Sequence, residues 1–418
     1  MSFFKLTIRD VPLEHTTVLV RADYNVPMTK AGKIGDDLRI RASLPTIEYL
    51  LERGCRVVIM SHMGRPEGKD PSLSLEPVAK RLAQLLKRDV RFVDDCIGDK
   101  VFQAVKRAAY PSVTLLQNLR YYKGEEADDH DFARKLAKST GARYFVQDGF
   151  GVVHRAHAST HAITLYIPSV SGLLLEREYT TITEAMEAPK RPLIAVMGGA
   201  KVSDKIAVIE RFVAVADKII IGGAMANTFL AYKGVNVGAS KVEQDQHYEL
   251  NKIYEAARAK VGDDVDDFII LPSDLAVASE ISPRETRQNK PIGEIGTSDI
   301  ALDIGDVTIE KVVSLIDTAQ TVVWNGTLGY AEIPAFAHGS ARLALELASH
   351  PDITSIIGGG DTTEFVLGWD GNDGKSFTYV STGGGASLEL MAGDKLPGIE
   401  SLLDSPQKKV YTNSNNHK

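Results

Sequence analysis

The segment PLIAVMGGAKVSDK (Pro192–Lys205) joins an apolar run directly to a loop of glycine and lysine. Leu193–Met197 is apolar throughout rather than alternating, which is typical of a strand buried on both faces in a parallel sheet covered by helices. The same pattern recurs along the chain. Further strands are predicted at Thr17–Arg21, Arg56–Ser61, Val113–Gln117, Tyr144–Asp148, Lys218–Ile221, Phe268–Pro272, Thr321–Trp324, Thr354–Ile357 and Phe377–Ser381.

Helical segments separate these strands, and repeated strand–helix–strand units predict an α/β doubly wound fold. Because there are two series of such units, we expect two parallel-sheet, Rossmann-like domains with a cleft and a hinge between them. The predicted helices are Leu44–Glu52, Leu75–Leu86, Asp131–Ser139, Leu173–Glu187, Lys205–Val215, Gln246–Lys260, Ile309–Ile316, Ser340–Ser349, Thr363–Leu367 and Ser387–Met391.

The boundary between the two series is predicted in residues 167–191. Pro168, Ser169, Ser171 and Gly172 interrupt the first series, and the helix Leu173–Glu187 follows them. We therefore expect an N-terminal domain at 1–172, an interdomain helix at 173–188 and a C-terminal domain at 189–395. Residues 396–418 are expected to return to the N-terminal domain and to end in a polar, frayed tail.

The bulk properties are those of a cytoplasmic globular protein. With 418 residues the chain is long enough for two domains. A net charge of -7 argues against nonspecific nucleic-acid or anionic-membrane binding. The two cysteines, Cys55 and Cys96, give no disulfide framework. The start MSFFKLTIRD is unlike a signal peptide, and we find no apolar run of membrane-spanning length.

Ligand-binding residue types follow the predicted strands, where loops of an α/β sheet form binding sites. The first half carries arginine and histidine, which suit phosphate and carboxylate groups. The second half carries glycine loops, whose backbone N–H groups can close on a polyphosphate. The first set comprises Arg21, Arg39, His62, Arg65, Arg120 and Arg155; the glycine loops begin at Gly198, Gly222, Gly358 and Gly383. This division predicts phosphoryl transfer between a small acid and a nucleotide.

Several residues allow two interpretations from their pattern alone. Lys201 and Lys205 could bind phosphates or be solvated, and Glu332 could accept from ribose hydroxyls or be solvated. Asp361 could cap a helix or bind nucleotide-associated Mg²⁺. A Walker A loop and a GxGxxG after a strand are both absent. His154, His157 and His161 lack acidic or cysteine partners at ligand spacing, so we interpret them as loop and packing residues.

Ten motifs follow one another along the chain: VRADYNVP (Val20–Pro27), DDLRIRASLPTI (Asp36–Ile47), SHMGRP (Ser61–Pro66), QNLRY (Gln117–Tyr121), DGFGVVHRAHAS (Asp148–Ser159), GGAKVSDK (Gly198–Lys205), IGGAMANTF (Ile221–Phe229), VWNGTLGYAE (Val323–Glu332), GGGDT (Gly358–Thr362) and STGGGASLE (Ser381–Glu389). Taken in this order, they resemble the phosphoglycerate kinase family, and the resemblance extends from about Thr7 to Leu403.

The resemblance implies reversible transfer between 1,3-bisphosphoglycerate with MgADP and 3-phosphoglycerate with MgATP, in a monomer. It implies 3-phosphoglycerate ligands at Asp23, Asn25, Arg39, His62, Gly64, Arg65, Arg120 and Arg155. It implies nucleotide ligands at Gly199, Ala200, Lys201, Lys205, Gly222, Gly223, Asn325, Glu332, Gly359, Gly360, Asp361 and Thr362. Catalytic groups are implied at Arg39, Lys201, Gly360 and Gly384, the last of which lies within the anion-binding nest Gly383–Gly385. The resemblance also implies that Asp361 is the Mg²⁺ ligand.

The chain departs from the family pattern without losing a charged site residue. Thr327 and Asp306 each replace a proline, Gly149 replaces an alanine, and QNLRY stands where the family has ENxRF. Thr327 and Asp306 raise a question about nucleotide preference. Alternatives are a catalytically impaired nucleotide-binding scaffold of the same fold and a nucleic-acid binder. Retention of Arg39, Lys201 and Asp361 argues against the scaffold, and the acidic net charge argues against nucleic acid.

Overall fold

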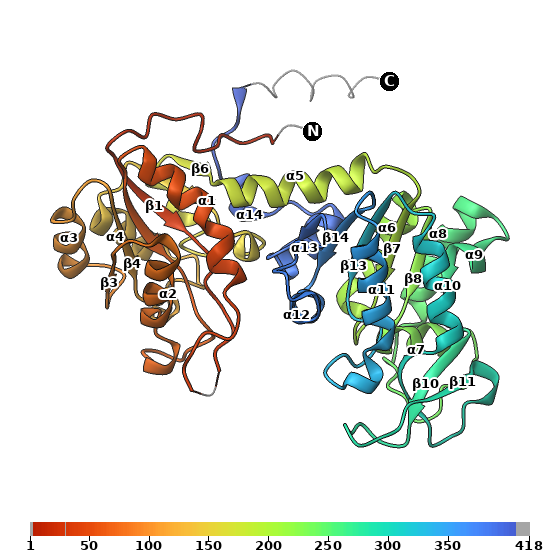
Figure 1. The fold of residues 1–418 in the computed structure, drawn as a ribbon. Coiled ribbons are helices and arrows are strands. Elements are labelled where there is room, and N and C mark those ends of the chain that lie inside the picture. Colours follow the sequence, from red (N-terminus) through yellow and green to blue (C-terminus); the bar gives the residue numbers. More distant parts are fainter. Residues whose placement is uncertain (1–2, 30, 407–418) are drawn as a thin grey trace, which may run out of the picture. The chain divides into compact units, whose positions relative to one another are not determined.

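The structure is a computed structural model that describes residues 3–29 and 31–406. The chain forms two compact units, one up to Thr180 together with the segment from Lys395, and one spanning Thr181–Asp394. Each unit is built on a six-stranded parallel sheet with helices between its strands (Figure 1). The predicted fold class is confirmed, whereas the domain boundaries given above stay predictions.

The first unit's sheet has the order β3-β4-β2-β1-β5-β6, and every pairing is parallel. All residues of the central strand β1 are buried, because helices lie over both faces of the sheet. The strands are β1 (Thr17–Arg21), β2 (Arg56–Met60), β3 (Val90–Val93), β4 (Ser112–Leu116), β5 (Tyr144–Gln147) and β6 (Ser169–Ser171). The helices are α1 (Leu38–Glu52), α2 (Glu76–Leu86), α3 (Asp99–Lys106) and α4 (His130–Thr140).

Two features of this unit differ from prediction. Ser169–Ser171, predicted to be a break, is the edge strand β6; its Ser169 and Ser171 hydroxyls donate to nearby backbone carbonyls, so no apolar run marks it. Helix α1 begins at Leu38, six positions before the predicted start at Leu44, and it accommodates Pro45. Arg39 therefore lies in the first turn of a helix and not in a loop after a strand.

The second unit's sheet has the order β15-β14-β13-β7-β8-β9, again entirely parallel. Its central strands β7 and β13 are buried at every residue. The strands are β7 (Leu193–Met197), β8 (Lys218–Ile221), β9 (Ile269–Ile270), β13 (Thr321–Asn325), β14 (Thr354–Gly358) and β15 (Tyr379–Val380). The helices are α6 (Ile206–Val215), α7 (Gly223–Tyr232), α8 (His247–Val261), α9 (Val265–Phe268), α10 (Asp306–Ile316), α11 (His338–Ser349), α12 (Gly360–Asp370) and α13 (Gly385–Ala392).

A separate antiparallel sheet of this unit was not predicted. It consists of β10 (Asp274–Ala278), flanked by β11 (Gln288–Pro291) and β12 (Ile300–Ile304). Strand β11 reads QNKP and is largely exposed, so it lacks the apolar pattern by which a strand is predicted. Asp306 opens α10, and its carboxylate accepts from Arg287 at 2.8 Å and from Asn289 at 2.6 Å, which ties α10 to the β11 region.

Helix α5 (Leu173–Glu187) has the predicted bounds. Its first turn binds a fully buried carboxylate: Asp148 Oδ1 accepts from Leu174 N at 3.0 Å and from the Thr46 hydroxyl at 2.9 Å. Burial raises the pKa of Asp148 to about 7. The short helix α14 (Pro397–Glu400) contacts the first unit, where Gly398 N donates to Val153 O at 2.9 Å. The predicted frayed tail lies almost wholly in 407–418, outside the described residues.

Within residues 3–29 and 31–406, we find no helix with the length and apolar character needed to cross a membrane.

Candidate active site

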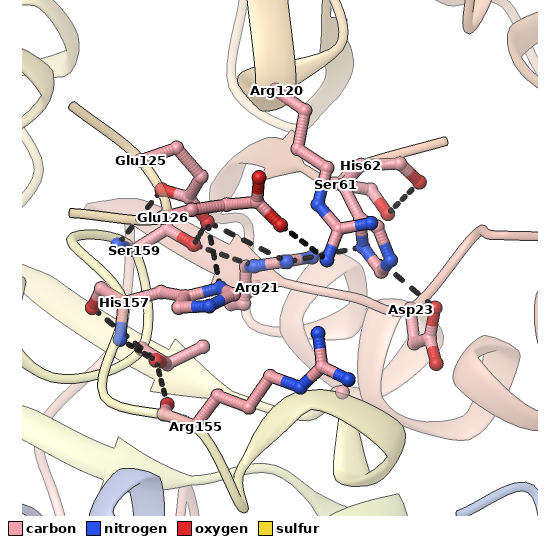
Figure 2. Close-up of polar contacts among 12 residues, drawn as sticks. Arg21, Asp23, Ser61, His62, Arg120, Glu125, Glu126, Arg155, His157 and Ser159 are labelled. Carbon is pink, nitrogen blue, oxygen red and sulfur yellow. Dashed lines mark hydrogen bonds and ion pairs between the residues drawn. The ribbon is translucent and has the colours of Figure 1, made fainter. Parts of the chain in front are cut away.

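The first unit gathers its predicted ligand residues at one edge of the sheet. Asp23 and Asn25 follow β1, His62 and Arg65 follow β2, Arg120 follows β4, and Arg155 follows β5. These four strands are neighbours in the order β4-β2-β1-β5, so their carboxyl ends meet. Figure 2 shows the labelled side chains converging there. Arg39 joins this cluster from the start of α1.

Asp23 and Arg39 form the best-defined contact of this cluster. Arg39 NH1 lies 3.1 Å from Asp23 Oδ2 and donates to Asn25 O at 3.0 Å. Burial acts to raise the pKa of Asp23, but its interactions with Arg39, His62 and Arg21 and a hydrogen bond from Asn25 N outweigh this effect, so the pKa is lowered. The Arg39 side chain stays 28% exposed, and among the described residues these two partners engage only NH1. The rest of its guanidinium can therefore bind an anion.

His62 is buried and electrically neutral. Burial is the main reason that its pKa lies well below the ordinary value; Asp23 opposes this shift, and Arg21 and Arg120 add to it. Its Nδ1 lies 3.2 Å from Arg21 NH2 and 4.0 Å from Asp23 Oδ1. Because the Arg21 guanidinium can only donate, Nδ1 accepts and the ring proton resides on Nε2. His62 thus offers a neutral N–H donor to a ligand.

The remaining arginines differ in how far the protein engages them. Arg120 NH1 donates to Gly64 O at 2.6 Å and NH2 lies 3.1 Å from Glu126 Oε1, but its Nε is buried with no partner among the described residues. Burial also lowers the pKa of Arg120. Arg65 is exposed, and the described residues give it no ion pair. These cations are only partly neutralised, which favours a polyanionic ligand.

Arg21 corrects the sequence interpretation. It was placed with the ligand arginines, yet its side chain is 1% exposed, and its Nε donates to Ser159 Oγ at 2.7 Å. Ser159 in turn donates to Glu125 at 2.6 Å, and Arg21 NH2 lies 3.8 Å from the same carboxylate (Figure 2). Arg21 and Glu125 therefore form buried contacts that hold the predicted ligand residues in place, and they are not proposed to contact the ligand themselves. Glu125 was missed because nothing near it in the sequence marks its buried partners.

In the second unit, a segment that we call the lysine loop (Gly198–Lys205) follows β7. Lys205 Nζ donates to Gly198 O at 2.8 Å and to Asn325 Oδ1 at 2.7 Å. Burial lowers the pKa of Lys205 to about 8, although Asp361 and Asp204 oppose that shift. Lys205 ends a 3₁₀ turn at Ser203–Lys205, and α6 begins at Ile206, one position after the predicted helix start at Lys205. Lys201 is exposed.

Glycines let the loops of this unit touch. A Cβ on Gly198 would lie 2.1 Å from Thr327 O, and one on Gly223, whose φ is +63°, would lie 2.6 Å from Gly199 N. Gly199 N donates to Thr327 O at 3.0 Å. This acceptor is the backbone carbonyl of position 327, which a proline at that position would also supply. The replacement of the family's proline by Thr327 is therefore compatible with this packing. The Gly199–Ala200 and Gly222–Gly223 segments are brought together.

Asn325 and the helices α12 and α13 complete this edge. Asn325 Nδ2 is buried with no partner among the described residues, and Gly359 is its close neighbour. Asp361 is exposed in the first turn of α12. The hydroxyl of buried Thr362 accepts from Gly326 N at 2.6 Å, so it holds the Asn325 loop. Gly360 and Gly384 lie at the starts of α12 and α13, where N–H groups lack intrahelical partners. Glu332 is exposed.

The fold and these two sets of anion-binding groups define an α/β phosphotransferase. A family model described as phosphoglycerate kinase matches residues 8–394. Two relatives with that name, from Dictyoglomus turgidum and Aquifex aeolicus, are each 44% identical over 399 and 401 residues, which is 96% of this chain and 98% of each relative.

Solved structures agree with these relatives. The phosphoglycerate kinase from Coxiella burnetii has a TM-score of 0.81 at 36% identity, and that from Pyrococcus horikoshii OT3 has 0.80 at 31%. Both matches cover 95% of this chain and 98% of the solved chain. The chain belongs to the phosphoglycerate kinase family, and it is an enzyme.

Proposed function

We propose that the protein transfers a phosphoryl group reversibly between 1,3-bisphosphoglycerate with MgADP and 3-phosphoglycerate with MgATP, as a step of glycolysis and gluconeogenesis. The observation that carries the proposal is the pair of complementary anion sites in a chain of this family. One unit supplies partly uncompensated arginines beside a neutral histidine, and the other supplies two lysines beside glycine-rich helix starts.

On the first unit, the proposed 3-phosphoglycerate ligands are Asp23, Asn25, Arg39, His62, Gly64, Arg65, Arg120 and Arg155. The buried, unpartnered Nε of Arg120 and the Nε2–H of His62 supply donors for the acid's phosphate and carboxylate. Asn25 Oδ1 accepts from Gly64 N at 2.9 Å, so Asn25 and Gly64 also fix the loop that carries His62 and Arg65.

On the second unit, Lys201 and Lys205 are proposed on the nucleotide phosphates, together with backbone groups of Gly359 and Gly360. Gly199, Ala200, Gly222 and Gly223 are proposed to line the adenine site, and Glu332 to bind ribose. The buried Nδ2 of Asn325 supplies a further phosphate donor. For Thr362 we propose only backbone participation, because its hydroxyl accepts from Gly326.

Asp361 is the proposed Mg²⁺ ligand. It fits because its carboxylate is exposed at the start of α12 and lies close enough to Lys205 to influence that residue's pKa. When bound with the nucleotide, Mg²⁺ would neutralise part of the phosphate charge.

We expect Asp361→Ala to weaken MgADP binding by roughly tenfold or more while leaving metal-free ADP binding within about twofold. Isothermal titration calorimetry with ADP in excess Mg²⁺ and in EDTA measures both affinities. Equal losses under the two conditions would show that Asp361 does not act through the metal.

The transfer itself needs positioning and charge stabilisation more than covalent help. The attacking group is a nucleotide phosphate in one direction and a carboxylate in the other, and both are ionised at neutral pH, so no general base is required. Arg39, Lys201 and the amides of Gly360 and Gly384 are proposed to stabilise the transferring group. Because the substrates bind different units, we propose closure about the α5 region, which also excludes water.

A coupled assay with 3-phosphoglycerate and MgATP tests the function directly. Steady turnover that depends on both substrates is expected. A chain that binds ADP but gives no turnover would instead support the impaired scaffold.

We further propose a cytoplasmic monomer without nucleic-acid partners, supported by the net charge of -7 and by two buried free cysteines, and testable by size-exclusion chromatography.

Lys205 gives the proposed nucleotide site a pH signature. Its pKa of about 8 means that the ammonium is mostly protonated at pH 7, half deprotonated near pH 8 and mostly neutral at pH 9, whereas a bound phosphate requires the charged form. ADP affinity should therefore fall roughly tenfold between pH 7 and pH 9. Lys205→Arg stays protonated, so its ADP affinity should remain nearly flat over this range. A fall of equal size in both proteins would assign the pH dependence to another group.

A further inference from the structure

Glu243 is an acidic residue that the proposed mechanism does not use, yet its carboxylate binds the lysine loop. Oε2 accepts from Val202 N at 2.6 Å and from Ser203 N at 3.1 Å, and Oε1 accepts from the Ser203 hydroxyl. Partial burial acts to raise the pKa of Glu243, but the Ser203 hydroxyl, these N–H groups and Lys201 outweigh it, so the pKa is lowered. Glu243 is therefore ionised at neutral pH.

Glu243 is itself fixed to the rest of the second unit. Its backbone N–H donates to the hydroxyl of Thr228, a buried residue of α7, at 3.1 Å. The start of α7 also binds the lysine loop, because Met225 N donates to Gly199 O at 2.9 Å. The loop is thus held at Gly199 by α7 and at Val202–Ser203 by the Glu243 carboxylate, with Lys201 between these two attachments.

These contacts address donors that would otherwise be unsatisfied. The Ser203–Lys205 turn has no side-chain cap of its own, and the first N–H groups of such a turn lack internal partners. A carboxylate at this position satisfies two of them and opposes their partial positive charge. It also occupies the donors that could draw a phosphate away from the lysines.

We propose that Glu243 is a positioning residue for the nucleotide phosphates: it presets the lysine loop in the geometry that presents Lys201 and Lys205. This inference rests on the proposed function. Without the carboxylate, the competent loop becomes a fraction of the population, and apparent nucleotide affinity falls by that fraction. Affinity for the acidic substrate, which binds the other unit, stays unchanged.

The test compares Glu243→Ala, Glu243→Gln and a matched control, Glu280→Ala, in the full chain. Glu280 is an exposed glutamate of the same unit. Glu243→Ala should raise the KM for the nucleotide roughly five- to thirtyfold and leave the KM for 3-phosphoglycerate within about twofold. Glu243→Gln keeps an acceptor for Val202 and Ser203, so its nucleotide KM should rise less than about threefold. Glu280→Ala should match the unchanged protein.

Rescue by a small carboxylate separates positioning from a general structural role. Formate or acetate should restore the nucleotide KM of Glu243→Ala in a saturable manner, whereas chloride at equal ionic strength should not. If Glu243→Ala lowers the melting temperature without a selective change in nucleotide KM, or if no carboxylate rescues it, the positioning role is wrong. Absence of turnover in the unchanged chain would overturn the proposed function instead. Should Glu243→Ala fail to fold, Ser203→Ala, which removes one contact, should still raise nucleotide KM about two- to fivefold.

Discussion

Arg39→Ala should reduce turnover by about 10³-fold while changing the Kd for ADP less than about twofold. Arg39 lies in the first turn of α1 on the first unit, whereas the proposed ADP ligands all lie on the second unit. Its NH1 is held by Asp23 and Asn25, and this anchoring orients the remaining donors without consuming them. The loss should therefore appear in the chemical step.

Two further variants define what Arg39 contributes. Arg39→Lys keeps the charge but loses the planar fork, so we expect it to recover only part of the lost turnover. Arg88→Ala removes an exposed arginine of the same unit and should behave like the unchanged protein. Stopped-flow measurement of single turnovers separates chemistry from product release. Turnover of Arg39→Ala within tenfold of the unchanged protein would refute its proposed role.

The second large effect concerns stability, and it arises from the buried contact between Arg21 and Glu125. Their side chains are 1% and 0% exposed, and Glu125 accepts from both the N–H and the hydroxyl of Ser159. Removing the carboxylate leaves the Arg21 cation buried beside His62. We expect Glu125→Ala to destabilise the first unit by about 3–5 kcal/mol.

The position of the two tryptophans allows the unfolding of each unit to be followed separately. Trp324 and Trp369 both lie in the second unit, so their fluorescence follows that unit during urea unfolding. Hydrogen exchange of β1 and β5 amides, followed by mass spectrometry, reports on the first unit. Glu125→Ala should accelerate exchange in β1 and β5 and shift the tryptophan transition much less.

Glu126→Ala is the matched control, since Glu126 is the next residue but is 52% exposed. Its ion pair with Arg120 is partly screened, and its loss should cost about 1 kcal/mol or less. Replacing both buried partners, as in Arg21→Met with Glu125→Leu, should destabilise less than Glu125→Ala, because no lone charge remains buried. Equal effects of Glu125→Ala and Glu126→Ala would contradict this account.

The sequence predicted best those elements whose cause is local. Strand β7 and helix α5 have the predicted bounds, because a continuous apolar run and a proline-flanked helical pattern define them within the segment itself. Strand β11 has no such pattern: its residues pair with β10 through backbone groups while their side chains face solvent. Helix α7 was hidden because Gly222 and Gly223 resemble loop residues.

The distinction between local and long-range causes also explains which parts of the candidate site could be predicted from the sequence. Arg21 and Arg39 follow the same compositional pattern, yet one is buried and the other partly exposed, and that difference depends on contacts such as Arg21 with Ser159, 138 positions away. The roles of Glu125 and Glu243 were not predicted, because each accepts hydrogen bonds from residues more than thirty positions away in the sequence. The type and position of a residue were enough to propose it as a ligand contact, whereas the residues that hold these side chains and loops in place could not be predicted.

The first unit is discontinuous in sequence, and this has a consequence for biosynthesis. Lys5 Nζ donates to the carbonyls of Glu400 and Leu402, and Gly398 N donates to Val153 O. The first unit therefore needs contacts from a segment that is translated after the whole second unit. The second unit, in contrast, is one uninterrupted stretch. During translation, the second unit can complete its contacts while the first unit still lacks those made by the segment from Lys395 onward.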